Sequence, residues 1–183
     1  SSSPKYNLLY QAFGWEVPAY IHCAPVMKNQ TEKLSKRHGD ASYQDLVAKG
    51  YLTQAILNYV ALLGWSPGGE REIFSLPELV EVFDVKGLSK SPAIFDILKL
   101  NHINAEWIRS LPLEEFHRLA LPWLRKAIKR EDIDTLTLCS LLQARCEVLS
   151  DLPPKVDFFD ALPDYDTQLY LNKKFKIDKP NAL

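Results

Sequence analysis

The sequence predicts an α+β protein that is mostly helical, with its few strands near the start of the chain and only helices after about residue 111. Two observations support this fold class. Residues 17–27 combine valine, tyrosine and isoleucine with two prolines, a composition that suits short edge strands. Most of the remaining sequence shows apolar residues at helical spacing, in longer amphipathic runs after residue 111. We therefore expect an α+β part followed by an all-α part.

Local signals mark where the helices of the first half begin and end. Ser3, followed by a proline, predicts a helix start, because the first helical position does not need the donor that proline lacks. Ser42 and Asp45 have the spacing of a capping box and predict a helix that stops at Gly50. Three further helices are predicted: one over 53–63, packed on both sides; one from Ser75 through Phe83, also opened by a capping box; and one that starts at Ser91-Pro92.

Two longer helices are predicted in the second half. The first covers 114–129 and is bent or broken at Pro122, which cannot donate to the helical ladder. The second covers 134–149, where Cys139 and Cys146 share one face and are expected to be buried thiols. The chain has three cysteines, an odd number with no metal-ligand spacing, so we predict neither zinc nor disulfides.

Composition narrows the class of protein further. The formal net charge of −1 excludes a uniformly basic nucleic-acid binder, although local basic patches can still contact phosphates. The longest apolar run, 55–65, is too short to span a bilayer, and the start of the chain lacks the pattern of a signal peptide. We therefore expect no membrane association. The expected buried thiols indicate a reducing setting, which we expect to be the cytoplasm; an organelle of bacterial ancestry is the alternative.

The most informative stretch is a compact basic loop over 33–39, with the sequence Lys-Leu-Ser-Lys-Arg-His-Gly. It shows neither alternation nor helical periodicity, so we interpret it as an exposed loop. Such a loop can close several ammonium and guanidinium donors around a polyphosphate. The alternative is an ordinary solvated turn.

The segments after the loop carry a resemblance. The runs NYVALLGWSPG over 58–68 and SKSPAIFD over 89–96 follow it in an order and spacing that resemble bacterial-type glutamyl-tRNA synthetase, a class I aminoacyl-tRNA synthetase. Residues 33–37 match the second class I signature, the Lys-Met-Ser-Lys-Ser loop, in a Lys-Leu-Ser-Lys-Arg form. The resemblance covers residues 4–175.

The resemblance implies a domain organisation. Residues 1–14 correspond to the last helix of the Rossmann catalytic domain, and 15–110 to a stem-contact domain that carries the loop. Residues 111–172 correspond to the first part of a helical anticodon-binding domain, and 173–183 to the start of a further helical element. The other class I signature, His-Ile-Gly-His, is absent from this sequence. We therefore expect a piece of a longer enzyme, inactive by itself, without the half that holds adenine and glutamate.

The resemblance also implies an activity. The intact enzyme would attach glutamate to tRNA(Glu) through a glutamyl-adenylate, as a monomer that uses ATP and Mg²⁺. Lys36 is the residue expected to bind the ATP phosphates, with Lys33 as a second cation and Ser35 as a hydrogen-bond donor. Arg37 replaces the usual final serine and would reach phosphate or RNA. For Lys33 and Lys36 the alternative is a solvated surface position.

A second candidate site is a set of cations on surfaces that would contact RNA. One group lies at the end of the predicted helix 114–129, where positive charge also suits the helix dipole. It consists of Arg125, Lys126, Lys129 and Arg130. Arg109, beside Trp107, is a similar candidate. The alternative for all of them is a solvated face.

Two other functions remain open at this point. A stand-alone, non-catalytic tRNA-binding or interaction module would keep the helical parts, but it would have no need for the loop cations. A glutaminyl-tRNA synthetase, or an enzyme that also charges the glutamine tRNA, shares a related loop. The run over 58–67 favours the glutamyl branch.

Overall fold

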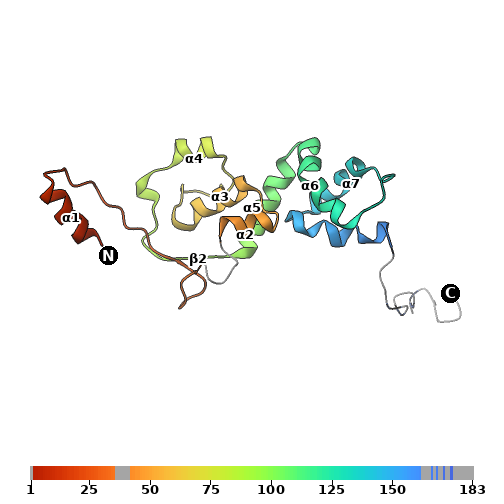
Figure 1. Cartoon of the computed structure of the whole chain (residues 1–183), viewed down its shortest axis with the longest axis horizontal. Helices are drawn as coiled ribbons and strands as arrows, with labels where there is room; N and C mark the ends of the chain where they lie inside the picture. The colour runs from red at the N-terminus through yellow and green to blue at the C-terminus, as the bar shows by residue number, and fades with distance from the viewer. Residues whose placement is uncertain are drawn as a thin grey trace.

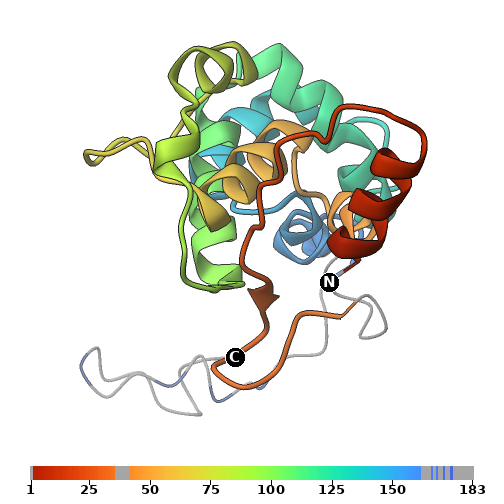
Figure 2. The same cartoon turned by 90° about the vertical axis from the view of Figure 1, so that its left-hand side faces the viewer.

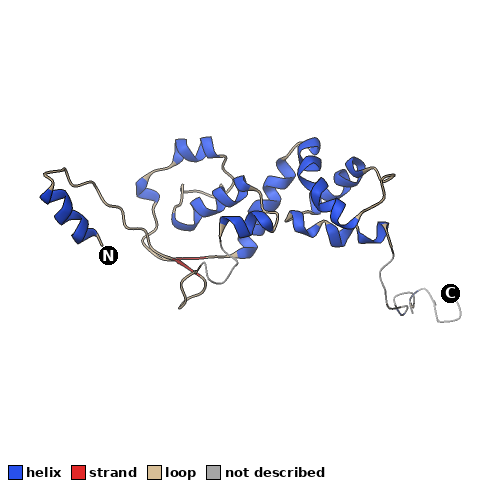
Figure 3. Ribbon diagram, in the orientation of Figure 1, coloured by secondary structure: helices blue, strands red, loops and turns tan. Residues whose placement is uncertain are grey.

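The computed structural model describes residues 2–35 and 42–161, together with the single positions 166, 168, 171 and 174. The molecule is elongated and dominated by helices, and the strands of the described part are two residues long (Figures 1 and 3). The α-helices are α1 (Ser3–Ala12), α2 (Tyr43–Ala48), α3 (Thr53–Gly64), α4 (Leu76–Val82), α5 (Ile97–Ser110), α6 (Leu113–Ala127) and α7 (Thr135–Leu142). The strands are β1 (Val26–Met27) and β2 (Ala93–Ile94). Short 3₁₀ helices are η2 (Val85–Gly87), η3 (Gln143–Arg145), η4 (Leu149–Asp151), η5 (Pro153–Lys155) and η6 (Asp157–Phe159).

The first segment forms an arm that stands apart from the helical body in Figure 1, and in Figure 2, seen from that end, the arm lies in front of the body. Helix α1 begins at Ser3, one residue before the predicted first helical position, so Pro4 is its second residue. Ser2 is the N-cap and its side chain makes no capping hydrogen bond, and Gly14 follows the helix with a φ of 65°. None of the α1 side chains is buried. The strands predicted over 17–27 are confirmed only at the last two residues, which pair in parallel with β2. The rest of that stretch is irregular, because a strand forms only where a second backbone completes the ladder.

Both predicted capping boxes are confirmed. The Ser42 hydroxyl accepts a hydrogen bond from the Asp45 amide, and the Asp45 carboxylate accepts one from the Ser42 amide. This capping box begins α2. Ser75 and Glu78 do the same for α4. Arg71 also contacts Glu78, and together these donors lower the pKa of that carboxyl to about 2. Residues close in sequence were therefore sufficient to fix both helix starts.

The prediction of a helix that starts at Ser91-Pro92 is wrong. Residues 93–94 form β2 instead, and α5 begins at Ile97. Its N-cap is Asp96, whose carboxylate accepts from the Leu98 amide at 2.9 Å and the Lys99 amide at 3.3 Å. A serine–proline pair is compatible with an extended chain as well as with a helix start, and here the pairing with β1 selects the strand.

The two long helices compare differently with their predictions. Helix α6 is not broken: it continues through Pro122, held by a buried face of Phe116, Ala120 and Leu124. The helix predicted over 134–149 is too long, because α7 ends at Leu142 and becomes the 3₁₀ turn η3. Within that turn, the Gln143 amide donates to two carbonyls at the end of α5, a contact that no helical periodicity could reveal.

One hydrophobic core runs through the body, from the α2–α3 region to the segment after α7. It contains the expected buried thiols, Cys139 and Cys146, and burial raises their pKa values to about 11 and about 12. Helix α3 buries only part of its surface: Leu57 and Val60 are 40% and 52% exposed, so the prediction of packing on both sides is wrong. A smaller cluster forms around Trp65 under α4. The large core crosses residue 111, so the α+β and all-α parts share one interior.

Candidate functional site

The start of the predicted phosphate-binding loop is held in a short hairpin. Met27 and Lys33 pair in an antiparallel bridge, and the Lys28 amide donates to the Glu32 carbonyl at 2.8 Å. The turn between them is closed by the Asn29 side chain, whose oxygen accepts from the amides of Thr31 and Glu32 at 2.9 and 2.8 Å. An asparagine that bonds its own backbone in this way stabilises a tight turn. The hairpin thus fixes the backbone on which Lys33 sits.

The hairpin is anchored to the body through β2. The Met27 carbonyl accepts from the Phe95 amide at 2.8 Å, next to the two paired residues of the strands. The Phe95 ring packs edge-on against Tyr59 of α3 at 5.4 Å, and the Asp96 amide donates to the Tyr59 hydroxyl at 2.7 Å. Tyr59 is 1% exposed, and burial raises its pKa to about 12. A buried, un-ionised tyrosine therefore ties the loop-bearing hairpin to α3.

The structure describes part of the predicted loop. Lys33 is exposed at the end of the hairpin, and Ser35 is half-buried two residues later. Lys36 and Arg37 lie outside the described residues. Lys33 and Ser35 therefore lie where the chain leaves the hairpin, in the first half of the predicted loop.

The predicted basic cluster does form at the C-terminal end of α6, and each cation has a local partner. The Arg125 guanidinium donates to the Arg130 carbonyl at 2.9 Å, and Arg130 pairs with Asp132. The Lys129 ammonium donates to two carbonyls of the last α6 turn, at 3.0 and 3.2 Å. The Lys126 ammonium lies over the Trp123 ring, 3.6 Å from its centroid. The cluster thus caps its own helix end as well as presenting positive charge.

The remaining candidate, Arg109, lies away from this cluster on α5. Its guanidinium forms an ion pair with Glu106 at 2.5 Å, one helical turn earlier. The same contact lowers the pKa of the Glu106 carboxyl. Arg109 lies just before the start of α6, whereas the basic cluster lies at the opposite end of that 15-residue helix, so the structure does not bring them together.

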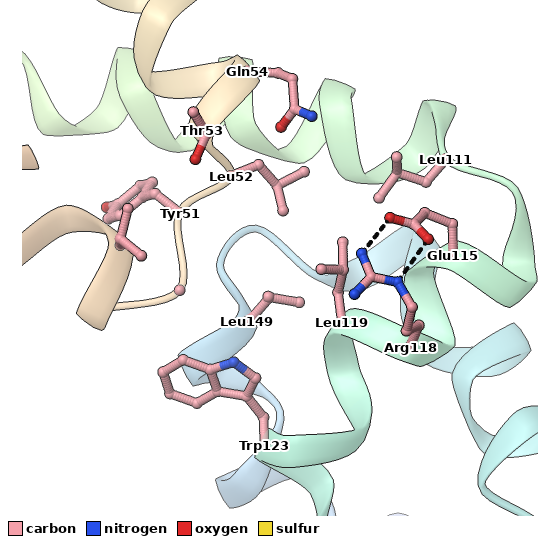
Figure 4. Close-up of a pocket in the computed structure, with 12 residues that line it drawn as sticks. Tyr51, Leu52, Thr53, Gln54, Leu111, Glu115, Arg118, Leu119, Trp123 and Leu149 are labelled. Carbon is pink, nitrogen blue, oxygen red and sulfur yellow. Dashed lines mark hydrogen bonds and ion pairs between the residues drawn. The ribbon is translucent and has the colours of Figure 1, made fainter. Parts of the chain in front are cut away.

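Sequence reasoning missed a pocket of about 400 Å³ between the start of α3 and α6. Thr53 and Gln54 line it from α3, and Leu119 and Trp123 from α6 (Figure 4). Arg118 and Glu115 also line the pocket, and the Arg118 guanidinium donates two hydrogen bonds, of 2.9 and 2.7 Å, to the Glu115 carboxylate. These bonds lower the pKa of that carboxyl. The spacing of Glu115 and Arg118 predicts a surface ion pair but gives no sign of the pocket beside it.

Two kinds of site are absent from the described ranges, 2–35 and 42–161 and the four single positions. No group of three or more histidine, cysteine, aspartate or glutamate side chains there is placed to hold a metal ion. No helix there combines the length and apolar character needed to cross a bilayer.

Two family models match the chain. The model described as tRNA synthetases class I (E and Q), catalytic domain, matches residues 1–102. The model described as an anticodon-binding domain matches residues 115–183. The loop-bearing hairpin and α3 thus lie in the first match, and α6 and the basic cluster in the second.

Similar proteins agree with these matches. A glutamate–tRNA ligase of Clostridium kluyveri is 57% identical over the whole chain, and one of Clostridium tetani is 58% identical. The chain spans 37% of the length of each. Among solved structures, a glutamate–tRNA ligase of Elizabethkingia meningosepticum is 26% identical with a TM-score of 0.77, over 95% of this chain and 39% of that one. Because the catalytic-domain model covers more than half of the residues, the chain belongs to the class I tRNA synthetases of the E and Q type.

Proposed function

We propose that the protein containing this chain is an ATP-dependent ligase that attaches glutamate to tRNA(Glu) through a glutamyl-adenylate. The observation that carries the proposal is the hairpin over 27–33, which fixes Lys33 at the base of the Lys-Leu-Ser-Lys-Arg loop and is anchored to α3. The similar Clostridium proteins that bear the name glutamate–tRNA ligase are 54–59% identical to it. The chain would act as one part of a longer enzyme, monomeric and cytoplasmic.

The loop would act on the phosphates of ATP. Formation of an adenylate releases pyrophosphate, so negative charge grows on the leaving group and fixed cations there stabilise the transition state most. Lys36 would bind these phosphates, with Lys33 as the second cation and Ser35 as a hydrogen-bond donor. Arg37 would contact phosphate or RNA. Mg²⁺ would enter with the ATP, because this ion is usually held largely by substrate phosphates.

The helical surfaces would dock the tRNA. The α6 cluster, which consists of Arg125, Lys126, Lys129 and Arg130, is exposed, although its members also contact local groups. We propose that it contacts the phosphate backbone, and that Arg109 does so from α5. Such contacts make binding fall steeply with salt.

The test compares two lysines in the full-length protein. Lys36→Ala should lower the rate of glutamate-dependent pyrophosphate release by about 10²- to 10³-fold, as expected for one preorganised donor. Its tRNA affinity should remain nearly unchanged. The control is Lys28→Ala, on the same hairpin but outside the loop motif, where Lys28 pairs with Glu32 at 3.6 Å. The control should keep both properties.

The outcome that contradicts the loop assignment is an equal loss of pyrophosphate release and tRNA affinity in Lys36→Ala. Activation of glutamine in place of glutamate would favour the glutaminyl alternative. Strong tRNA binding with no activation of either amino acid by the full-length protein would favour a non-catalytic module.

A further inference from the structure

A single buried side chain joins the two parts of the helical body. Asn104 of α5 is fully buried. Its side-chain oxygen accepts from the Leu52 amide at 2.8 Å, at the start of α3, and its side-chain nitrogen donates to the Glu147 carbonyl after α7. The amide therefore bonds α5 both to a segment in the catalytic-domain match and to a segment in the anticodon-domain match.

The same two segments also touch each other directly. The Leu149 amide donates to the Gly50 carbonyl at 3.2 Å. Gly50 has a φ of 91°, and a Cβ there would lie 2.8 Å from the Leu149 Cβ. Only glycine fits such a conformation and approach without strain. We call the contacts of Asn104 with Leu52 and Glu147, together with that of Gly50 with Leu149, the junction clamp.

The junction clamp is connected on one side to the loop. Leu52 is the N-cap of α3, and α3 holds the β2 segment through Tyr59, which in turn anchors the hairpin with Lys33. On the other side, Gln143 of η3 donates to the Ile108 and Leu111 carbonyls, both at 2.9 Å, so α5 is tied to the C-terminal helices a second time. Figure 1 shows α5 running between α3 and α6. Helix α5 therefore sets the position of the C-terminal helices relative to the loop-bearing hairpin.

We infer that Asn104 is a positioning residue that fixes the orientation of the loop-bearing part relative to the anticodon-binding helices, so that one tRNA engages both. This inference rests on the proposed function. A ligand that contacts two linked surfaces gains affinity only if their geometry permits both contacts at once. A buried polar bond in each direction holds that geometry more strictly than apolar packing alone, because any displacement leaves buried groups unpaired.

The experiment measures the affinity of the full-length protein for three RNAs: whole tRNA(Glu), a minihelix of its acceptor stem, and its anticodon stem–loop. Asn104→Ala should weaken binding of the whole tRNA by about tenfold, because the two contacts no longer cooperate. Binding of each half-molecule should change by less than about twofold, because each surface stays intact. Whole-tRNA binding by the unchanged protein is measured first, and its absence would contradict the proposed function itself.

The matched control is Asn58→Ala. Asn58 is also a fully buried asparagine, but it bonds Glu72, Phe74 and Trp107, all outside the anticodon-domain match. It should lower stability without changing the ratio of whole-tRNA to minihelix affinity. If Asn104→Ala does not fold, Gln143→Ala loosens the same junction from a half-buried position and should give a smaller loss of the same selectivity.

Two results would overturn the inference. One is a parallel loss for the whole tRNA and both half-molecules, which would make Asn104 an ordinary stabilising residue. The other is unchanged affinity for the whole tRNA in a folded Asn104→Ala or Gln143→Ala variant, which would show that the orientation of the two parts does not depend on the side-chain bonds that tie α5 to the C-terminal segments.

Discussion

The N-terminal arm and the helical body both contain large apolar side chains, most of which are exposed in the arm, whereas many of those in the body form a buried core. In the arm, Leu8, Phe13 and Trp15 are 66%, 63% and 61% exposed. In the body, Leu124 and Phe116 are fully buried. The arm forms a helix over Ser3–Ala12, and the body forms the helices that its two capping boxes predict, so local sequence is enough to start a helix in both regions. Burial of an apolar face depends on a partner, and the described structure provides one only for the body.

The largest expected effect is a difference in the free energy of unfolding between two leucine-to-alanine variants. Leu124→Ala should lower the free energy of unfolding by about 3 kcal/mol, because it leaves a cavity in the packed core. The matched change Leu8→Ala in the arm should alter it by less than about 0.5 kcal/mol. Urea unfolding of the full-length protein, followed by circular dichroism, measures both. A large loss from Leu8→Ala would mean that the arm is packed in the whole protein and that the contrast between the regions disappears there.

A smaller effect is expected for two asparagines. Asn58→Ala should cost about 2 kcal/mol, because the buried Phe74 amide and the half-buried Glu72 carbonyl lose their partner. Asn29→Ala, at the exposed turn of the hairpin, should cost less than about 1 kcal/mol, since water replaces the lost bonds. The same unfolding measurement applies. Equal losses would mean that burial does not decide the cost of removing an asparagine in this protein.

The smallest expected change concerns thiol chemistry and leaves stability untouched. Cys23 in the arm is exposed, whereas Cys139 and Cys146 are buried with pKa values raised to about 11 and about 12. Only the thiolate reacts with alkylating reagents, so raising the pH from about 7 to about 9 should leave both buried thiols protonated and unlabelled. Peptide mass spectrometry after brief alkylation should find label at Cys23 alone. Label at Cys146 in the folded protein would contradict the burial of that residue.

Several features of the site could be predicted from the sequence. The candidate loop was visible as a run of cations over 33–37, and the end of α6 was visible as a basic cluster. The sequence did not predict which neighbouring groups each cation contacts. The bond from Arg125 to the Arg130 carbonyl and the position of Lys126 over Trp123 depend on how the chain turns after α6.

The sequence by itself determined the starts of α2 and α4, because a capping box needs only residues three positions apart. Ser42 with Asp45 and Ser75 with Glu78 are the examples. Tertiary structure alone decided the pairing of β1 with β2, the end of α7 at Leu142 and the junction clamp at Asn104. Each of these depends on a partner dozens of residues away, and such a partner leaves no periodic signal near the residue it binds.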